Sequence, residues 1–148
     1  MVTEFNLRLA WETEHKRLDP GVVGAGVAAV LGDARKGIYF VAELAPGAEG
    51  PEGGGPGSRV VGQCSVTYEW SDWRNGDFWW LQSVYVAAPW RRRGVFQALF
   101  EHVRQAAAAA GAVGLRLYVE ENNEAAQATY RRHGMTRTAY QVFERELR

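Results

Sequence analysis

A strand that leads at once into a basic loop and a helix is the feature of this sequence that most directly indicates chemistry. The run Val84-Tyr85-Val86 is followed by Arg91-Arg92-Arg93-Gly94, and a strongly periodic helix is predicted from about Val95. The first N–H groups of a helix lack intrahelical partners and lie at the positive end of its dipole, so they bind anions. Arginine adds forked donors for phosphate oxygens, and glycine lets the backbone approach closely. The segment predicts a site for the phosphates of a large anionic cofactor.

Two other interpretations of the triple arginine are a solvated basic turn and a nucleic-acid site. Lys+Arg and Asp+Glu balance at 17 each, so the formal net charge is zero. Nucleic-acid-binding domains usually carry a basic excess on one face. We therefore expect no nucleic-acid partner.

Length and cysteine content limit the architecture. At 148 residues the chain suffices for one domain, expected over residues 1–148, and is too short for two ordinary ones. Cys64 is the single cysteine, which excludes an intrachain disulfide and a paired-thiolate metal site, and we expect it to be a small buried hydrophobe. Neither a membrane span nor a signal-peptide core is visible, so we predict a cytoplasmic protein with no membrane partner and no metal.

The N-terminal half must supply helices and a hairpin to hold the basic loop. A helix is expected around residues 5–10, and Asp19-Pro20 predicts an N-cap and first turn for a second helix. Strands are predicted at 38–44, 60–70 and 78–86, with a flexible Gly/Pro-rich loop at about 45–58 and an Asn75-Gly76 hairpin turn.

The C-terminal half continues with a helix, a strand and a second helix. Apolar residues from Val95 recur at i, i+3 and i+4, and Gly111 ends that helix. A fourth strand is predicted at 115–119, and Asn122 or Asn123 caps a short helix to about Arg132. Residues 136–147 are expected to hold one or two final strands.

Two motifs in order give the chain a family resemblance. Arg91 and Gly94 match a loop pattern, Gln/Arg-x-x-Gly-x-Gly/Ala. A later pattern, Asn-x-x-Ala-x-x-x-Tyr-x-x-x-Gly-Phe, is matched in register by Asn123, Ala126, Tyr130 and Gly134, with Met135 in place of the aromatic residue. The chain from about Ile38 onward thereby resembles the GNAT superfamily of acyl-CoA-dependent N-acyltransferases.

The resemblance implies an α/β (α+β) fold with a mixed, mostly antiparallel central sheet flanked by helices. It also implies a V-shaped split between the fourth and fifth family strands, here the strand ending at Val86 and the strand starting near Leu115. Family members usually open with a short edge strand before the first helix, and this sequence begins inside or just before that helix, so either the first strand is absent or the recorded start is late. Its neighbour would then be unpaired unless something covers it.

The resemblance implies acetyl-CoA as co-substrate. Backbone groups of Val84, Tyr85 and Val86 would pair with the pantetheine arm. The phosphates would be held by the loop and the first helical turn, which comprise Arg91, Arg92, Arg93, Gly94, Val95, Phe96 and Gln97. Phe96 replaces a small residue of the pattern, and we expect its ring to point into the core. Asn123 would bind coenzyme, or it acts as a helix N-cap only.

Acetyl transfer needs a neutral amine, donors for an oxyanion and a proton for the departing thiolate. Tyr130 occupies the position that supplies this proton in many relatives, although plain packing of an aromatic residue is the alternative. A backbone N–H near Val84 is the expected oxyanion donor.

The base is harder to assign, because residues 78–86 hold no carboxylate where relatives often have a glutamate. Gln82 is expected to position a water that takes the proton. Glu69 is the best carboxylate candidate, ahead of Asp72 and then of Glu12 or Glu14, with ordinary surface charge as the alternative for each.

Aromatic residues are dense in the predicted hairpin; they are Trp70, Trp73, Phe78, Trp79, Trp80 and Tyr85. They favour either a pocket for a cationic amine or packing in the core and in a possible homodimer. Acceptor specificity is expected in the first two helices, around residues 12–19, and in the hairpin at 70–78.

The sequence predicts an N-acetyltransferase that transfers an acetyl group from acetyl-CoA to a primary amine of a small molecule or peptide. The transfer would proceed by direct attack through a tetrahedral intermediate. The alternative is a catalytically weak acyl-CoA-binding sensor or protein-interaction module of the same fold.

Overall fold

The computed structural model describes residues 1–48 and 59–147, which divide between two compact units, Met1–Leu117 and Tyr118–Arg148. The second unit holds one helix, α4 (Glu124–Arg132). The first unit holds the remaining elements: α1 (Val2–Glu14), α2 (Pro20–Gly32), β1 (Ile38–Glu43), β2 (Val60–Ser71), β3 (Gly76–Val86), the short 3-10 helix η1 (Ala88–Trp90), α3 (Val95–Ala109) and β4 (Gly114–Leu117).

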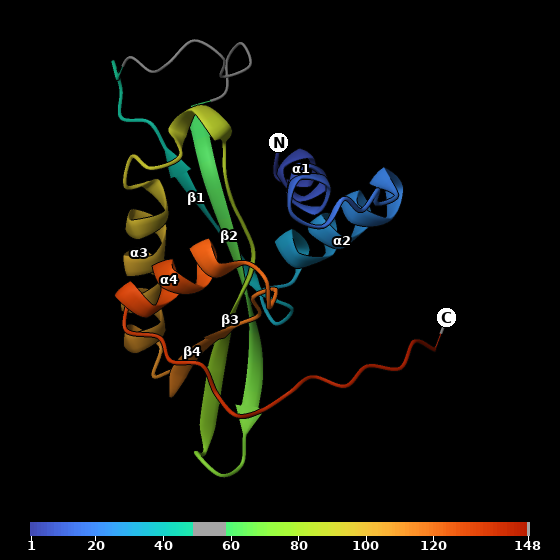
Figure 1. The fold of residues 1–148 in the computed structure, drawn as a ribbon, viewed down its shortest axis with the longest axis vertical. Helices are drawn as coiled ribbons and strands as arrows, with labels where there is room; N and C mark the ends of the chain where they lie inside the picture. Colours follow the sequence, from blue (N-terminus) through green and yellow to red (C-terminus); the bar gives the residue numbers. More distant parts are fainter. Residues whose placement is uncertain (49–58, 148) are drawn as a thin grey trace. The chain divides into compact units, whose positions relative to one another are not determined.

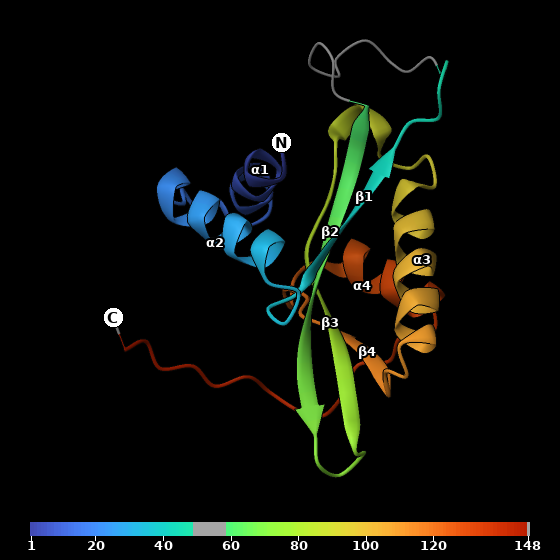
Figure 2. The same cartoon turned by 180° about the vertical axis from the view of Figure 1, so that it is seen from behind.

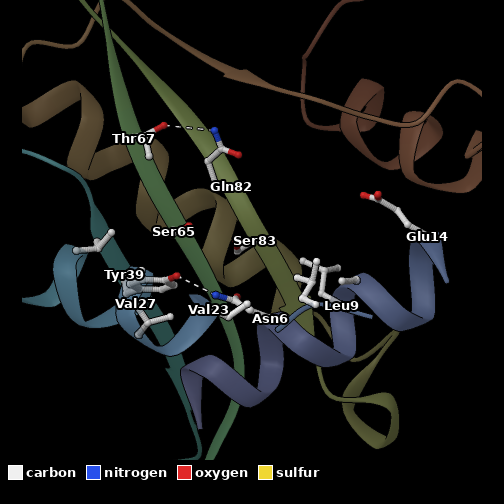
Figure 3. A pocket seen from close by; sticks show the side chains of 14 residues that line it. Asn6, Leu9, Glu14, Val23, Val27, Tyr39, Ser65, Thr67, Gln82 and Ser83 are labelled. Atoms are coloured by element: carbon white, nitrogen blue, oxygen red, sulfur yellow. Dashed lines mark hydrogen bonds between the residues drawn. The ribbon is translucent and has the colours of Figure 1, made fainter. Parts of the chain in front are cut away.

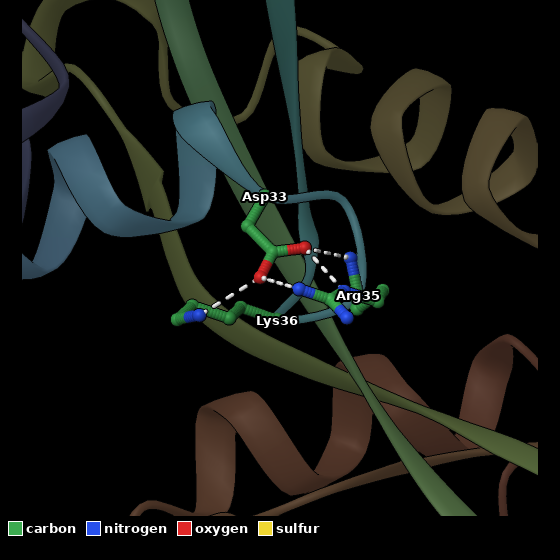
Figure 4. Close-up of polar contacts among 3 residues, drawn as sticks. All are labelled: Asp33, Arg35 and Lys36. Atoms are coloured by element: carbon green, nitrogen blue, oxygen red, sulfur yellow. Dashed lines mark hydrogen bonds and ion pairs between the residues drawn. The ribbon is translucent and has the colours of Figure 1, made fainter.

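A side-chain cap sets the start of α2, and a turn held by Asp33 follows its end. Asp19 accepts a hydrogen bond from the Val22 N–H at 2.9 Å, and Pro20 lies in the first turn, as predicted. After α2, the Asp33 carboxylate accepts from the backbone and guanidinium of Arg35 and from Lys36, as Figure 4 shows. The hydrogen bonds from Arg35 and Lys36 hold the pKa of Asp33 well below its usual range. This turn directs the chain into β1.

The four strands form one sheet in the order β1-β2-β3-β4. Pairing is antiparallel between β1 and β2 and between β2 and β3, and parallel between β3 and β4, which α3 connects. Asn75 has φ 48° in the turn before β3, and Ser71 pairs with Gly76, so the predicted hairpin is confirmed, but its turn spans residues 72–75 and Gly76 is the first residue of β3. The expected mixed, mostly antiparallel sheet flanked by helices is therefore confirmed.

The two faces of β2 differ in polarity. Figures 1 and 2 show α3 on one side of the sheet and α1 with α2 on the other. Toward α3, β2 presents buried Cys64 and Val66, which share the core with Leu99 and Val103. Toward α1 and α2 it presents a polar stripe, which comprises Gln63, Ser65 and Thr67.

The two ends of β3 are paired differently. Residues 78–81, the paired end, pair with β2 on one side and with β4 on the other. Residues 82–86, the open end, continue beyond the last pair with β4, and no other described strand takes its place. On the β2 side the register shifts between Gln63↔Tyr85 and Ser65↔Gln82, which places one extra residue in β3. This β-bulge includes Ser83, whose φ is 47°.

Some expected elements differ from the structure. Residues 136–147 hold no strand, so the predicted final strands are wrong. Their alternating apolar residues favour a strand, but Tyr140, Val142 and Phe143 are 66–92 % exposed and form no ladder. The fourth strand ends at Leu117 rather than at residue 119. Most of the predicted Gly/Pro-rich loop, residues 49–58, lies outside the described residues.

The N-terminal residues form helix from Val2, so the described part of the chain has no strand before α1 and β1 lies at the sheet edge. None of the described helices has the length and apolar content that crossing a membrane requires.

Candidate functional site

The basic loop, residues 91–94, follows η1 and ends where α3 begins. Arg92 has φ 59° and Gly94 has φ 81°, so the backbone turns through two left-handed residues before Val95. Gly94 is the N-cap, and no side chain caps this helix end. A Cβ at Gly94 would meet no atom within 4 Å, so the glycine is required by its φ rather than by crowding. The first amides of α3 are thus available to an anion.

The three arginines of the loop make different contacts. Arg91 forms an ion pair with Glu12 of α1, donates from Nε to the Val86 carbonyl at 2.9 Å, and lies over the Tyr85 ring. Arg93 lies 5.8 Å from the centre of the Trp90 ring. Arg91 therefore ties the loop to α1, whereas exposed Arg92 and Arg93 are better placed to meet a ligand.

Phe96 packs along its own helix. Its ring centroid lies 5.9 Å from that of buried Phe100, one turn further on, and the side chain is half-buried. This contact explains how a large residue is accommodated where the family pattern has a small one.

The bulge in β3 exposes a short backbone segment at the open end. Ser83 and Val84 lie opposite Cys64 alone, so the regular ladder to β2 is interrupted here. The next residue, Tyr85, is buried against Phe5 at 5.0 Å between ring centroids, and its hydroxyl donates to Glu12 at 2.9 Å. The open end is therefore anchored by its side chains while part of its backbone is left without a strand partner.

A buried polar chain lies between the bulge and α1. Gln63 has no exposed surface, and its Nε2 donates to Asn6 Oδ1 at 2.6 Å and to the Ser83 carbonyl at 3.4 Å. Asn6 in turn donates to the Tyr39 hydroxyl at 3.0 Å. The Oε1 atom of Gln63 has no hydrogen-bond partner among the described residues. These contacts fix the position of the bulge relative to α1.

A cleft of about 440 Å³ lies between α1, α2 and the sheet (Figure 3). Its apolar lining residues come from the helical region and are Leu9, Ala10, Leu18, Val23, Gly26, Val27 and Val30. Its polar lining residues are Asn6, Glu14, Tyr39, Ser65, Thr67, Gln82 and Ser83. The cleft thus reaches the bulge and is bounded by the two helices in which acceptor specificity is expected.

The structure brings two of the predicted proton-transfer candidates to this cleft. Gln82 lines it and donates to Thr67 Oγ1 at 3.4 Å (Figure 3). Glu14 lines it as well. Glu12 instead holds Arg91 and Tyr85. Burial opposes ionisation of Glu12, but hydrogen bonds from Arg91 and Tyr85 outweigh it and lower the pKa of Glu12.

Glu69 and Asp72 lie elsewhere in the hairpin. Glu69 accepts from Arg116 at 2.8 Å and from the Trp80 indole. It does not line the cleft itself and is two residues along β2 from Thr67, which does, or roughly 7 Å. Asp72 accepts from the Trp73 N–H at the hairpin tip. The geometry gives both carboxylates structural partners and does not bring either one to the cleft.

The aromatic residues of the hairpin fall into a buried and an exposed group. Trp79 is buried, whereas Trp70 and Trp73 are 61 % and 89 % exposed. Arg116 lies 3.7 Å from the centre of the Phe78 ring. The cation over an aromatic face is here supplied by the protein itself.

The later motif residues belong to the second unit. Asn123 Oδ1 accepts from the Ala126 N–H at 3.0 Å, so Asn123 is the N-cap of α4, and the choice between Asn122 and Asn123 is settled. Tyr130 lies on α4 and is half-buried.

Cys64 is buried with 2 % of its surface exposed, as predicted. Burial raises the pKa of its thiol to about 12, so the thiolate nucleophile is scarce at neutral pH. The described residues hold no cluster of His, Cys, Asp and Glu that would bind a metal ion.

The sequence reasoning missed the polar stripe of β2. Gln63, Ser65 and Thr67 alternate with apolar residues in a strand that lies between two neighbours. Polar residues at every second position of such a strand indicate a polar face, which a central strand has little reason to carry unless it borders a site.

Comparisons with known proteins agree with this architecture. Residues 33–135 match the family described as the acetyltransferase (GNAT) family. A possible acetyltransferase from Clostridium difficile 630 is 43 % identical, with a TM-score of 0.84 over 99 % of this chain and 89 % of that one. Glucosamine-6-phosphate N-acetyltransferase from Arabidopsis thaliana shares the fold at 14 % identity, with a TM-score of 0.68 over 97 % and 87 % of the two chains. No curated protein matches the sequence. The chain belongs to the GNAT acetyltransferase family.

Proposed function

We propose that this protein transfers an acetyl group from acetyl-CoA to a primary amine at the open end of β3. The observation that carries the proposal is the path of one strand. β3 loses β4 as a neighbour after Leu81, bulges at Ser83, and leads into the basic loop at the start of α3. This path combines a strand edge that no described strand pairs, an interrupted ladder and a helix end whose amides suit an anion.

The coenzyme fits this path from one end to the other. Its pantetheine arm carries amides that pair with the backbone of Val84, Tyr85 and Val86 as an added strand would. Its pyrophosphate is held by the N–H groups of residues 92–97, and the guanidinium groups of Arg92 and Arg93 supply charge. Arg91, already bound to Glu12, positions the loop.

The acceptor amine binds in the cleft, beside the bulge. A water held by Gln82 and Thr67 accepts the proton of the amine, and a backbone N–H near Val84 stabilises the oxyanion. Tyr130 then protonates the departing thiolate, as the family resemblance implies. Direct attack is favoured over an acetyl-cysteine because the single thiol is buried and protonated.

A coenzyme-binding sensor is the second candidate, since residues 78–86 hold no carboxylate that would act as a base on β3. We also propose a cytoplasmic location, which a lone buried cysteine supports. A small-molecule or peptide amine is the expected partner, and the homodimer is a further proposal.

Free-thiol release from acetyl-CoA, measured with a panel of amines, tests the proposed function. The transferase predicts amine-dependent thiol release together with acetylated product. Calorimetric binding of acetyl-CoA without thiol release from any amine would favour the sensor. Absence of coenzyme binding would contradict both.

A further inference from the structure

The charge among the described residues that line the cleft is of one sign, negative. Among the described residues that line it, Glu14 is the only charged one, and no Lys, Arg or His contributes. Glu14 pairs with Lys16 at 2.6 Å, and both side chains are about half exposed or more, so water screens this pair. An incoming ammonium can replace Lys16 at Glu14 at little cost.

The walls of the cleft divide by polarity as well. The helices supply a wall that includes Leu9, Val23 and Val27, and the sheet supplies Tyr39, Thr67 and Gln82, as Figure 3 shows. All the polar groups from the sheet are neutral. A ligand with an apolar body and a polar end fits both walls, and the polar end meets hydroxyl and amide groups near the bulge.

An acidic ligand fits this lining poorly. A carboxylate or phosphate would exchange water for a described lining that holds no cationic residue, and the cation that reaches this lining, Lys16, is already paired with Glu14, so the exchange is costly. It would also lie in the same cleft as Glu14, and like charges repel most strongly where water is partly excluded.

We infer that the acceptor is a small amine with an apolar body and no carboxylate or phosphate, and that Glu14 selects it by charge. This inference rests on the proposed function and narrows its acceptor. Glu14 is here a specificity-determining residue, distinct from the water that takes the proton.

Matched acceptors test the inference, and thiol release gives kcat/KM for each. The pairs are phenethylamine with phenylalanine, tyramine with tyrosine, and ethanolamine with phosphoethanolamine. In each pair the amine without the acid should be favoured by about a hundredfold, as expected for an anion left without a partner. The kcat/KM for phenethylamine should also exceed that for ethanolamine, because phenethylamine contacts the apolar wall.

The Glu14→Gln variant tests the named residue. It should raise KM for phenethylamine about five- to tenfold and leave kcat nearly unchanged. The difference in kcat/KM between phenethylamine and phenylalanine should therefore become smaller. Glu4→Gln, on the same helix and paired with Arg8, is the matched control and should change none of these values.

Calorimetric binding of phenethylamine and phenylalanine gives a readout that does not depend on turnover. Equal or tighter binding of the acids, or an unchanged preference in Glu14→Gln, would overturn the inference and leave the transferase intact. Preferred, Glu14-dependent binding of phenethylamine without thiol release would support the inference about the cleft and contradict the proposed function.

Discussion

The two ends of β3 belong to one strand but differ in their strand neighbours and in their expected roles. At the paired end β3 lies between β2 and β4, and Trp79 and Leu81 are buried. At the open end one neighbour is lost, the ladder to β2 bulges, and the chain turns into the basic loop. Backbone groups that have two strand neighbours stabilise the fold, whereas those that have one can bind a ligand.

The charged groups show the same contrast. At the paired end Glu69, Arg116 and the Trp80 indole satisfy one another across three strands. Near the open end Glu12 holds Arg91 and Tyr85, which ties α1 to the loop that we propose for the phosphates. We therefore expect substitutions at the paired end to affect stability and substitutions near the open end to affect binding or turnover.

The largest expected effect is on stability at the paired end. Trp79→Ala should lower the free energy of unfolding by about 3–5 kcal/mol, because it leaves a cavity among buried side chains. Urea titration measures this change. Trp73→Ala, at an 89 % exposed position, should stay within about 0.5 kcal/mol. Similar losses in the two variants would contradict the account of the core.

Turnover should depend on Tyr130 as the proton donor that the family resemblance implies. Tyr130→Phe should lower kcat by about a hundredfold, because the phenylalanine cannot protonate the thiolate. The dissociation constant for CoA should change less than about twofold, since the ring is retained. Steady-state kinetics over a range of pH, with calorimetry, measure both. Unaltered turnover at every pH would remove Tyr130 from the mechanism.

Coenzyme affinity should depend on the loop that follows the open end. The double variant Arg92→Ala/Arg93→Ala should bind CoA about tenfold more weakly, because charge-assisted hydrogen bonds to phosphate are lost. Arg104→Ala removes an exposed arginine of α3 that is paired with Glu101, and it is the control. An equal loss in the control would indicate a general charge effect.

The Glu69→Gln variant distinguishes two roles of Glu69: the general base that the sequence suggests and the structural ion pair that its contacts indicate. Its partly exposed ion pair predicts that Glu69→Gln lowers stability by less than about 1 kcal/mol and leaves kcat nearly unchanged. If Glu69 were the general base, Glu69→Gln would instead lower kcat by about a hundredfold or more. Such a loss would show that the paired end takes part in the reaction.

The smallest expected effect is the pH dependence that Glu12 confers. Its pKa is lower in the folded protein than its ordinary value of 4.5, so its ion pair stabilises the fold above that pH. The stability difference between the wild type and Glu12→Gln should be constant from pH 5 to 7. It should shrink as the pH falls through the lowered pKa. Urea titrations across this range measure it, and a difference that grows on acidification would contradict the assignment.

Features that depend on local chemistry could be predicted from the sequence. The Asp19-Pro20 start of α2, the hairpin around Asn75 and the cap of α4 at Asn123 each rest on a side chain and its near neighbours. The basic loop before α3 has the same local origin. The structure confirms these elements.

Features that depend on pairing between distant segments could not be predicted from the sequence. The bulge at Ser83 is visible only against the register of β2, and the contact of Glu14 with the cleft requires α1 to lie over the sheet. The wrong prediction of strands after Thr136 has a similar cause, because apolar alternation indicates strand propensity but supplies no partner. The partner of Glu69 could not be predicted either, because Arg116 lies on β4, far along the chain.

Hydrogen exchange of the backbone amides, with and without acetyl-CoA, tests the central claim most directly. The account predicts that acetyl-CoA slows exchange at the open end, within residues 84–86, and at residues 92–97 of the loop and helix start. Exchange at the paired end, residues 78–81, should not change. Protection confined to the paired end, or no protection at residues 84–86 and 92–97 under saturating acetyl-CoA, would contradict the account.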